Sequence, residues 1–127
     1  MDKKILTSGK AEIIYFSDEN SKKYISVSVS YIKDDYNGFK NRRGYWLNVH
    51  PEEAQREYCD FMKSYYWQIK FMAYSGYRFF LGEIKRDSKK AFTDALKVAN
   101  EKLPYLVSDV CYKNNIVLPE NWELVNK

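Results

Sequence analysis

Basic side chains gather in two short segments of this sequence, and the chemistry they offer is phosphate binding. The first group comprises Lys40, Arg42 and Arg43, and the second comprises Arg86, Lys89 and Lys90. The second group surrounds Asp87-Ser88, either of which can cap the N-terminus of a helix. Backbone N–H groups at a helix N-terminus bind anions, and cations beside them strengthen that site. The two segments therefore predict phosphate contacts; the alternative for each is a solvated basic turn.

Aromatic residues make up 17% of the chain, and several alternate with basic ones in segments that form strands. Aromatic faces stack on nucleic-acid bases, and each stack contributes about 1–3 kcal/mol to the binding of single strands. Strand parity assigns one set to the core: Ile25, Val27, Leu47, Trp67 and Phe71. The set of opposite parity is predicted to face an open side of the sheet: Tyr24, Tyr66, Tyr74 and Phe80. Alternatively, these four pack beneath a short helix, the C-terminal tail or a second subunit.

An acidic segment, residues 51–60, offers a different kind of surface. Its acids are Glu52, Glu53, Glu57 and Asp60, against a single basic residue, Arg56. Clustered carboxylates can mimic the phosphates of a nucleic acid and so bind a protein. The segment supports an alternative hypothesis, an interaction or inhibitor protein that acts through these acids or through an aromatic patch.

Glu83-Ile84-Lys85 is the tripeptide closest to a catalytic signature. An acid, a spacer and a lysine at the end of an apolar strand resemble the element with which restriction-type nucleases hold Mg²⁺ and position the attacking water. Such a site also needs an acid on a neighbouring strand, and Asp60 is the only near candidate upstream. Because the tripeptide is common by chance, a Mg²⁺-dependent nuclease is the least favoured hypothesis.

The remaining residue types argue against several classes of function. Two cysteines, Cys59 and Cys111, and one histidine, His50, are too few to make a zinc site readily. The sequence contains no phosphate-binding or dinucleotide-binding glycine motif and no nucleophile elbow, so we expect no cofactor, metal or catalytic residue. No apolar run approaches a membrane span and the N-terminus lacks a signal-peptide core, so we expect a cytoplasmic protein.

The hydrophobic pattern predicts five strands and a short helix ahead of a long C-terminal helix. Strands are predicted at 11–17, 23–33, 44–49, 65–74 and 77–85, the last two joined by a hairpin turn at Ser75-Gly76. Residues 51–62 begin with a proline and two acids, as the first turn of a helix does, and predict the short helix; a long loop is the alternative. Residues 1–10 are expected to be a loose N-terminal end.

The strongest pattern begins at Ser88, where apolar residues recur every three or four positions up to Cys111. Pro104 lies inside this stripe and predicts a kink, and Asn114-Asn115 predicts the end of the helix. Residues 116–127 are expected to form an extended tail with Trp122 as its anchor. The connections between strands are too short for crossover helices. We therefore expect a single α+β domain: a twisted antiparallel sheet of about five strands, in the order β-β-β-short α-β-β-α, packed on the long helix.

The leading hypothesis from these observations is a small, non-enzymatic nucleic-acid-binding accessory protein of a bacterial or phage mobile element. It would bind through the basic clusters and the sheet aromatics, and single-stranded DNA is one candidate ligand. The net charge of +4 is too small to identify such a protein without that arrangement. The expected partner is a nucleic acid or a host protein, with no membrane involved, and a homodimer is one candidate assembly.

Overall fold

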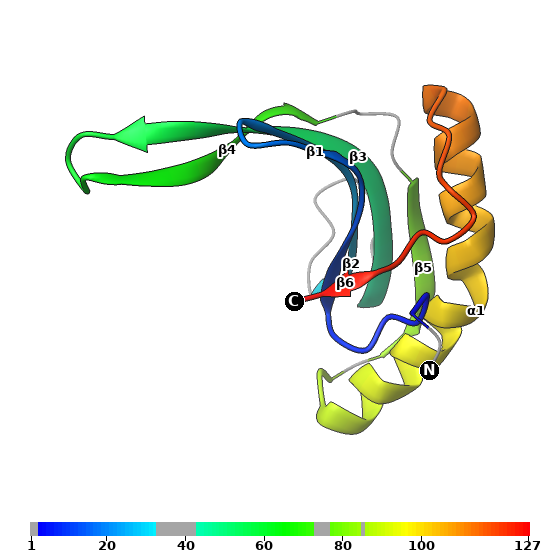
Figure 1. Ribbon diagram of the computed structural model, residues 1–127. Coiled ribbons are helices and arrows are strands. Elements are labelled where there is room, and N and C mark those ends of the chain that lie inside the picture. Colours follow the sequence, from blue (N-terminus) through cyan, green and yellow to red (C-terminus); the bar gives the residue numbers. More distant parts are fainter. Residues whose placement is uncertain (1–2, 33–42, 73–76, 85) are drawn as a thin grey trace.

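The computed structural model describes residues 3–32, 43–72, 77–84 and 86–127. Its elements are β1 (Lys10–Ser17), β2 (Ser21–Ile32), β3 (Gly44–Cys59), β4 (Ser64–Met72), β5 (Tyr77–Glu83), α1 (Lys89–Asn114) and β6 (Val125–Asn126). One helix packs on one face of an antiparallel sheet of six strands, so the α+β class is confirmed (Figure 1). The sheet order is β4-β3-β2-β1-β6, and β5 also pairs with β3.

The long strand β3 organises the sheet, and the helix predicted at residues 51–62 is wrong. Residues 51–55 continue the strand and pair with β2, Pro51 opposite Ile25 and Gln55 opposite Ser21. Pro51 has no N–H to donate, which normally excludes proline from a central strand. Here Pro51 lies in a gap between the two strands that share the other side of β3. The pairing with β5 covers β3 up to Val49, and the pairing with β4 begins at Glu52.

The strands β4 and β5 do not form the predicted hairpin. Both run antiparallel to β3 along the same edge, β4 beside residues 52–59 and β5 beside residues 44–49. They therefore follow one another in the same direction. The predicted turn residues, Ser75-Gly76, lie outside the described residues.

A bulge in β4 reverses the expected orientation of its aromatic side chains. Phe71 lies opposite Glu53, but the next residue of β3, Ala54, lies opposite Ile69, so one extra residue is inserted between the two pairs. Because side chains alternate between the faces of a strand, one inserted residue moves all that follow to the other face. Trp67 is therefore exposed, and its assignment to the core is wrong. Ile69, on the same face, is exposed as well.

The core lies between α1 and the face of the sheet that carries the odd-numbered side chains of β2 and β3. Ile25, Val27 and Leu47, all predicted for the core, are fully buried there, against helix residues such as Ala99 and Leu103. Spacings of three and four place the apolar side chains of α1 on the stripe that meets the sheet.

The helix begins and ends where the sequence indicates. The Ser88 side chain caps the N-terminus by accepting a hydrogen bond from the Ala91 N–H, and Asn115 ends the helix in a left-handed conformation with φ of 55°. Pro104 lies inside α1, and a kink there remains a prediction.

The first and last described segments are hydrogen-bonded to each other and to the body of the molecule, contrary to the expectation of a loose N-terminal segment. Leu6 is 1% exposed, and the side chain of Asn100 in α1 bonds both its N–H and its carbonyl oxygen. Leu124 donates its N–H to the Lys3 carbonyl, and β6 then pairs with β1. The tail is not extended throughout, because it turns at residues 120–121, where Trp122 N–H bonds to the Pro119 carbonyl. Trp122 packs against the core.

Candidate functional site

A projecting hairpin carries the largest group of exposed apolar side chains. We call residues 54–69, the end of β3 and most of β4, the arm. It projects from the body of the molecule past Gln55, the last residue of β3 that pairs with β2 (Figure 1). Seven of the fourteen exposed large hydrophobic residues in the described chain belong to it: Tyr58, Phe61, Met62, Tyr65, Tyr66, Trp67 and Ile69. Phe61, in the turn at the tip, is 96% exposed. Exposed apolar groups concentrated in this way mark an interaction surface.

The sheet face opposite α1, here called the helix-free face, carries aromatic and basic side chains in contact. At one end, the Arg78 guanidinium lies 4.8 Å from the ring centre of Trp46, and that ring lies 4.9 Å from Phe80. The cross-strand register places these side chains on the same face as the even-numbered residues of β2 and β3. Phe80, predicted to stack on bases, is thus on the face that the helix does not cover.

The same face continues onto the arm. The Arg56 guanidinium lies 4.2 Å from the ring centre of Tyr65, whose ring meets that of Tyr58 edge-on at 5.1 Å. Arg56 is directly opposite Trp67 in the register, and Lys22 Nζ, from β2, lies 5.5 Å from the Trp67 ring. Cation–aromatic pairs therefore occupy both ends of this face of the sheet.

Between these ends lies a buried polar network that includes two of the predicted site residues. The Tyr24 hydroxyl donates to one oxygen of Glu52, and His50 Nε2 lies 2.9 Å from the other. Beside them, Lys22 forms a 3.3 Å ion pair with Glu12 and lies over the Tyr24 ring. Burial, and then the Glu52 carboxylate, raises the pKa of Tyr24.

This network corrects two predictions. Tyr24 is 5% exposed, so it is not a base-stacking residue, and Glu52 is 6% exposed, so it is not part of an acidic surface. Tyr66 is exposed, but on the opposite face of the arm from Trp67, because its partner in the register is Glu57 rather than Arg56. Tyr74 lies outside the described residues.

The remaining acids of the 51–60 segment are dispersed along the strand. Glu53 is half-exposed and lies 3.8 Å from Lys23, and Asp60 is exposed in the turn at the tip of the arm. Glu53 and Glu57 lie on the opposite face of β3 from Glu52. The continuous acidic patch expected of a helix is therefore absent from these described residues.

The two predicted basic clusters meet at one end of the molecule, as far as they are described. The Arg43 carbonyl accepts a hydrogen bond from Ile84 N–H, which brings the start of β3 beside the segment that leads into α1. The Tyr45 hydroxyl donates a hydrogen bond to the Asp87 carboxylate and so holds that segment against β3. Arg86, Lys89 and Lys90 are exposed there, and Lys40 and Arg42 lie outside the described residues.

The proposed nuclease residues do not come together. Glu83 lies opposite Gly44, at the first residue of β3, whereas Asp60 follows its last residue, at the tip of the arm. Among the described residues, no group of three or more histidine, cysteine, aspartate or glutamate side chains has the geometry of a metal site. Asp60 is thus not the second acid of a site at Glu83.

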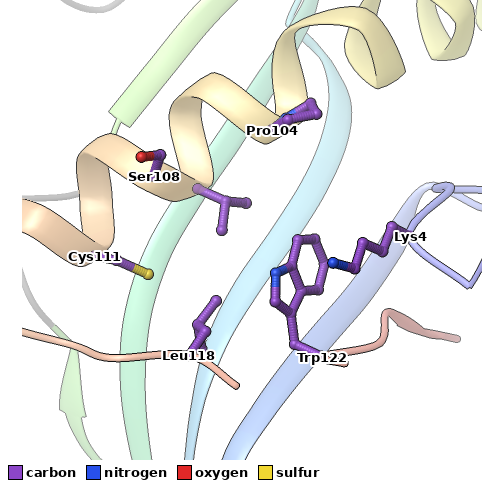
Figure 2. Close-up of a pocket in the computed structure, with 7 residues that line it drawn as sticks. Lys4, Pro104, Ser108, Cys111, Leu118 and Trp122 are labelled. Atoms are coloured by element: carbon purple, nitrogen blue, oxygen red, sulfur yellow. The ribbon is translucent and has the colours of Figure 1, made fainter. Parts of the chain in front are cut away.

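A cleft of about 390 Å³ lies between α1 and the C-terminal tail (Figure 2). Trp122 and Leu118 from the tail face Pro104, Ser108 and Cys111 of the helix across it. The Lys4 ammonium closes one side, 4.5 Å from the Trp122 ring centre and 2.9 Å from the Glu120 carbonyl. Burial raises the pKa of Cys111 and keeps its thiol protonated. The residues that line the cleft are mostly apolar and pack the C-terminal tail against α1.

Sequence reasoning did not include Trp46, Arg56 and Arg78 among the candidate site residues, although the structure places them in the cation–aromatic contacts of this face. Trp46 has the strand parity opposite to the predicted core residue Leu47, so parity alone could have placed it beside Phe80. Arg56 was assigned to a helix, so its position on a strand face could not be predicted. The position of Arg78 beside Trp46 can be predicted only when the register between β3 and β5 is known.

No protein-family model matches the chain, and neither the curated proteins nor the solved structures contain a significant match to it. Within the described ranges, the structure has no helix with the length and apolar character needed to cross a membrane.

Proposed function

We propose that this protein binds single-stranded nucleic acid along the helix-free face and the arm. The observation that carries the proposal is the placement of Trp46, Phe80 and Arg78 at one end of this face and Trp67, Tyr65 and Arg56 at the other. Proteins that bind single strands without sequence preference combine stacking aromatics with cations that follow the backbone. A bacterial or phage mobile-element protein that accompanies single-stranded DNA fits this chemistry.

The charge on the face supports an anionic ligand. Arg56 and Arg78 are exposed, whereas Glu12 is paired with Lys22 and Lys127, and Glu52 is buried and hydrogen-bonded to Tyr24 and His50. The exposed basic residues at the start of α1 add positive potential at the Arg78 end, because β5 leads directly into that segment.

The test is fluorescence anisotropy with a labelled oligodeoxythymidylate over a series of salt concentrations. Trp67→Ala should weaken binding by about 1–3 kcal/mol, because one base loses its stacking partner. Arg56→Ala and Arg78→Ala should each reduce the slope of log K against log salt by about 0.7, the value for one phosphate contact on a single strand.

Two controls lie on α1, away from this face. Tyr105→Ala removes an exposed aromatic side chain and Lys97→Ala an exposed cation, and both should bind like the wild type. Absence of binding at low salt, or equal losses in the control and test variants, contradicts the proposal.

A second candidate, an interaction or inhibitor protein, is favoured by the tip of the arm. Phe61 and Met62 are exposed in the turn between β3 and β4, and no other described strand pairs with this part of the arm. Exposed aromatic and apolar residues of this kind serve as anchors in protein interfaces. Phe61→Ala should then abolish capture of a host protein from lysate treated with nuclease, while binding to the oligonucleotide stays unchanged.

A further inference from the structure

The outer edge of β4 is an unprotected strand edge. In the described chain, β4 pairs with β3 on one side and ends the strand order of the sheet on the other. Proteins usually protect such edges with charges, prolines or bulges. Residues 64–69 contain no charged residue, no proline and no glycine, and the bulge comes only after Ile69. This stretch therefore presents unpaired backbone groups and apolar side chains together.

We propose that a second copy of this chain pairs with this edge, β4 against β4 in antiparallel orientation, with the two-fold axis at Trp67. Trp67 then lies opposite the partner's Trp67, and Tyr65 lies opposite the partner's Ile69. On the other face, Tyr66 lies opposite the partner's Gln68. On the face that carries Trp67, each apolar side chain meets another apolar one, and such pairs stabilise neighbouring strands.

The alternatives to this register are less favourable. A shift by one residue in either direction sets two of the three side chains Tyr65, Trp67 and Ile69 opposite a serine, glutamine or lysine, and only the third opposite an aromatic residue, Tyr66. A parallel arrangement places Lys70 directly opposite the partner's Lys70, whereas the antiparallel register places it opposite Ser64. The self-match of this strand and the position of its one charge identify the partner as a second copy.

The shape of the molecule permits the pairing. The arm projects from the body, so two arms can align edge to edge while the bodies stay apart (Figure 1). Past Gln55, where β2 ends its pairing, the arm is a ribbon of two strands in the described chain. Such ribbons are marginally stable in water, and pairing converts two of them into one sheet of four strands.

Dimerisation in this form is independent of nucleic-acid binding. Edge pairing uses the backbone of β4 and leaves both faces of the arm accessible, including the face that carries Arg56 and Trp67. The oligomeric state is therefore measured without nucleic acid, and its outcome does not decide the proposed function.

Cross-linking tests the register in a Cys59→Ser/Cys111→Ser background, which removes the two native thiols. Residues directly opposite in an antiparallel pair have Cα atoms about 4.5–5.5 Å apart, a distance that a disulfide spans. Trp67→Cys should therefore form a covalent dimer on oxidation with diamide. Ile69→Cys is the matched control: its two copies are four residues out of register, roughly 13 Å apart, and should stay uncoupled. Ile69→Cys mixed with Tyr65→Cys should cross-link.

Sedimentation equilibrium gives a second test that needs no thiol. The wild-type protein should be dimeric, and Trp67→Lys, which sets two like charges face to face, should raise the dissociation constant about tenfold or more. Tyr105→Lys introduces the same charge at an exposed aromatic position of α1 and should leave the dimer intact. Circular dichroism checks that each variant is folded.

A paired substitution makes the result specific to this register. Tyr65→Glu and Ile69→Lys should each weaken the dimer, and the double variant should restore it, because opposite charges then face each other across the axis twice. Within one chain these two positions are four residues apart along a strand and do not reach each other. A wild-type monomer at all concentrations overturns the proposal. So does a dimer that Trp67→Lys leaves unchanged, or equal cross-linking at positions 67 and 69.

Discussion

Asn100 offers the sharpest test of how the N-terminal segment is held. Its side-chain oxygen accepts the Leu6 N–H at 2.7 Å, and its amide nitrogen donates to the Leu6 carbonyl at 2.9 Å. Asn100→Asp keeps the acceptor but replaces the donor by a second carboxylate oxygen, which faces the carbonyl. The variant leaves one backbone acceptor unsatisfied next to a buried leucine, so it should lose about 1–3 kcal/mol of the free energy of unfolding near pH 7.

The loss should disappear in acid, because a protonated carboxyl again offers a donor to the Leu6 carbonyl. The native state thus favours the protonated form and raises the pKa of the introduced group above its unfolded value, about 3.9. Because the pKa is raised in the native state, the stability that the protonated carboxyl contributes is complete below the unfolded-state pKa. It is lost as the pH rises through the native-state pKa. The difference from wild type should therefore grow between about pH 4 and pH 6.

Urea denaturation followed by tryptophan fluorescence, at several pH values, measures this difference. Asn100→Ala, which removes both hydrogen bonds and cannot titrate, should show a loss of about 2–4 kcal/mol that does not vary with pH. If Asn100→Asp is as stable as the wild type at neutral pH, or if its deficit does not depend on pH, the two hydrogen bonds do not hold the segment.

Three further outcomes are expected. Burial and then Asp87 raise the pKa of Tyr45 to about 12 from its ordinary 10.0. The stability that the protonated hydroxyl contributes is therefore complete below pH 10 and lost towards pH 12. In urea denaturation, Tyr45→Phe should lose less of its free energy of unfolding between pH 10 and pH 12 than the wild type does. A β-carbon on Gly44 would collide with the Gly82 carbonyl oxygen, so Gly44→Ala should lower the melting temperature, with a cost of about 1–3 kcal/mol. Glu52→Ala should cost about 2–4 kcal/mol in chemical denaturation because it strands a buried hydroxyl, whereas Glu53→Ala should stay within about 0.5 kcal/mol of wild type.

The elements with a regular pattern could be predicted from the sequence. The alternation of Ile25, Val27 and Val29 with serines gave the orientation of β2, because a half-buried strand has a period of two. The helix was predicted from its apolar stripe, a cap at Asp87 or Ser88 and an end at Asn114-Asn115, each of which has a local physical cause. The structure has the cap at Ser88 and the end at Asn115.

The length of β3 could not be predicted, because local signals opposed it. Pro51 and the acids after it favour a helix start, and only pairing with β2 on one side and β4 and β5 on the other holds them extended. The bulge after Ile69 has no signal in the sequence either. Since that bulge decides which face Trp67 occupies, parity counted from Phe71 led to the wrong face.

The candidate site was predicted only in part, for the same reason. Phe80 and the basic residues at the start of α1 follow from local pattern, and the structure places them at the Arg78 end of the helix-free face and beside it. Tyr24 has the correct parity, but its hydroxyl finds Glu52 on the neighbouring strand and it is buried. Contacts between residues far apart in the chain determined which aromatic side chains stay exposed.

The junction of the two chain ends has a consequence for how the protein is made. Ala11 in β1 pairs with Asn126 in β6, and Leu124 bonds to Lys3. A ribosome adds roughly 115 residues between these partners, which takes about 6–23 s at ordinary rates of synthesis. The hairpin of β1 and β2 forms within microseconds of its emergence. The β1 edge that β6 covers therefore stays uncovered until residues 125–126 have been added. Molecular chaperones have that interval in which to act on the exposed edge.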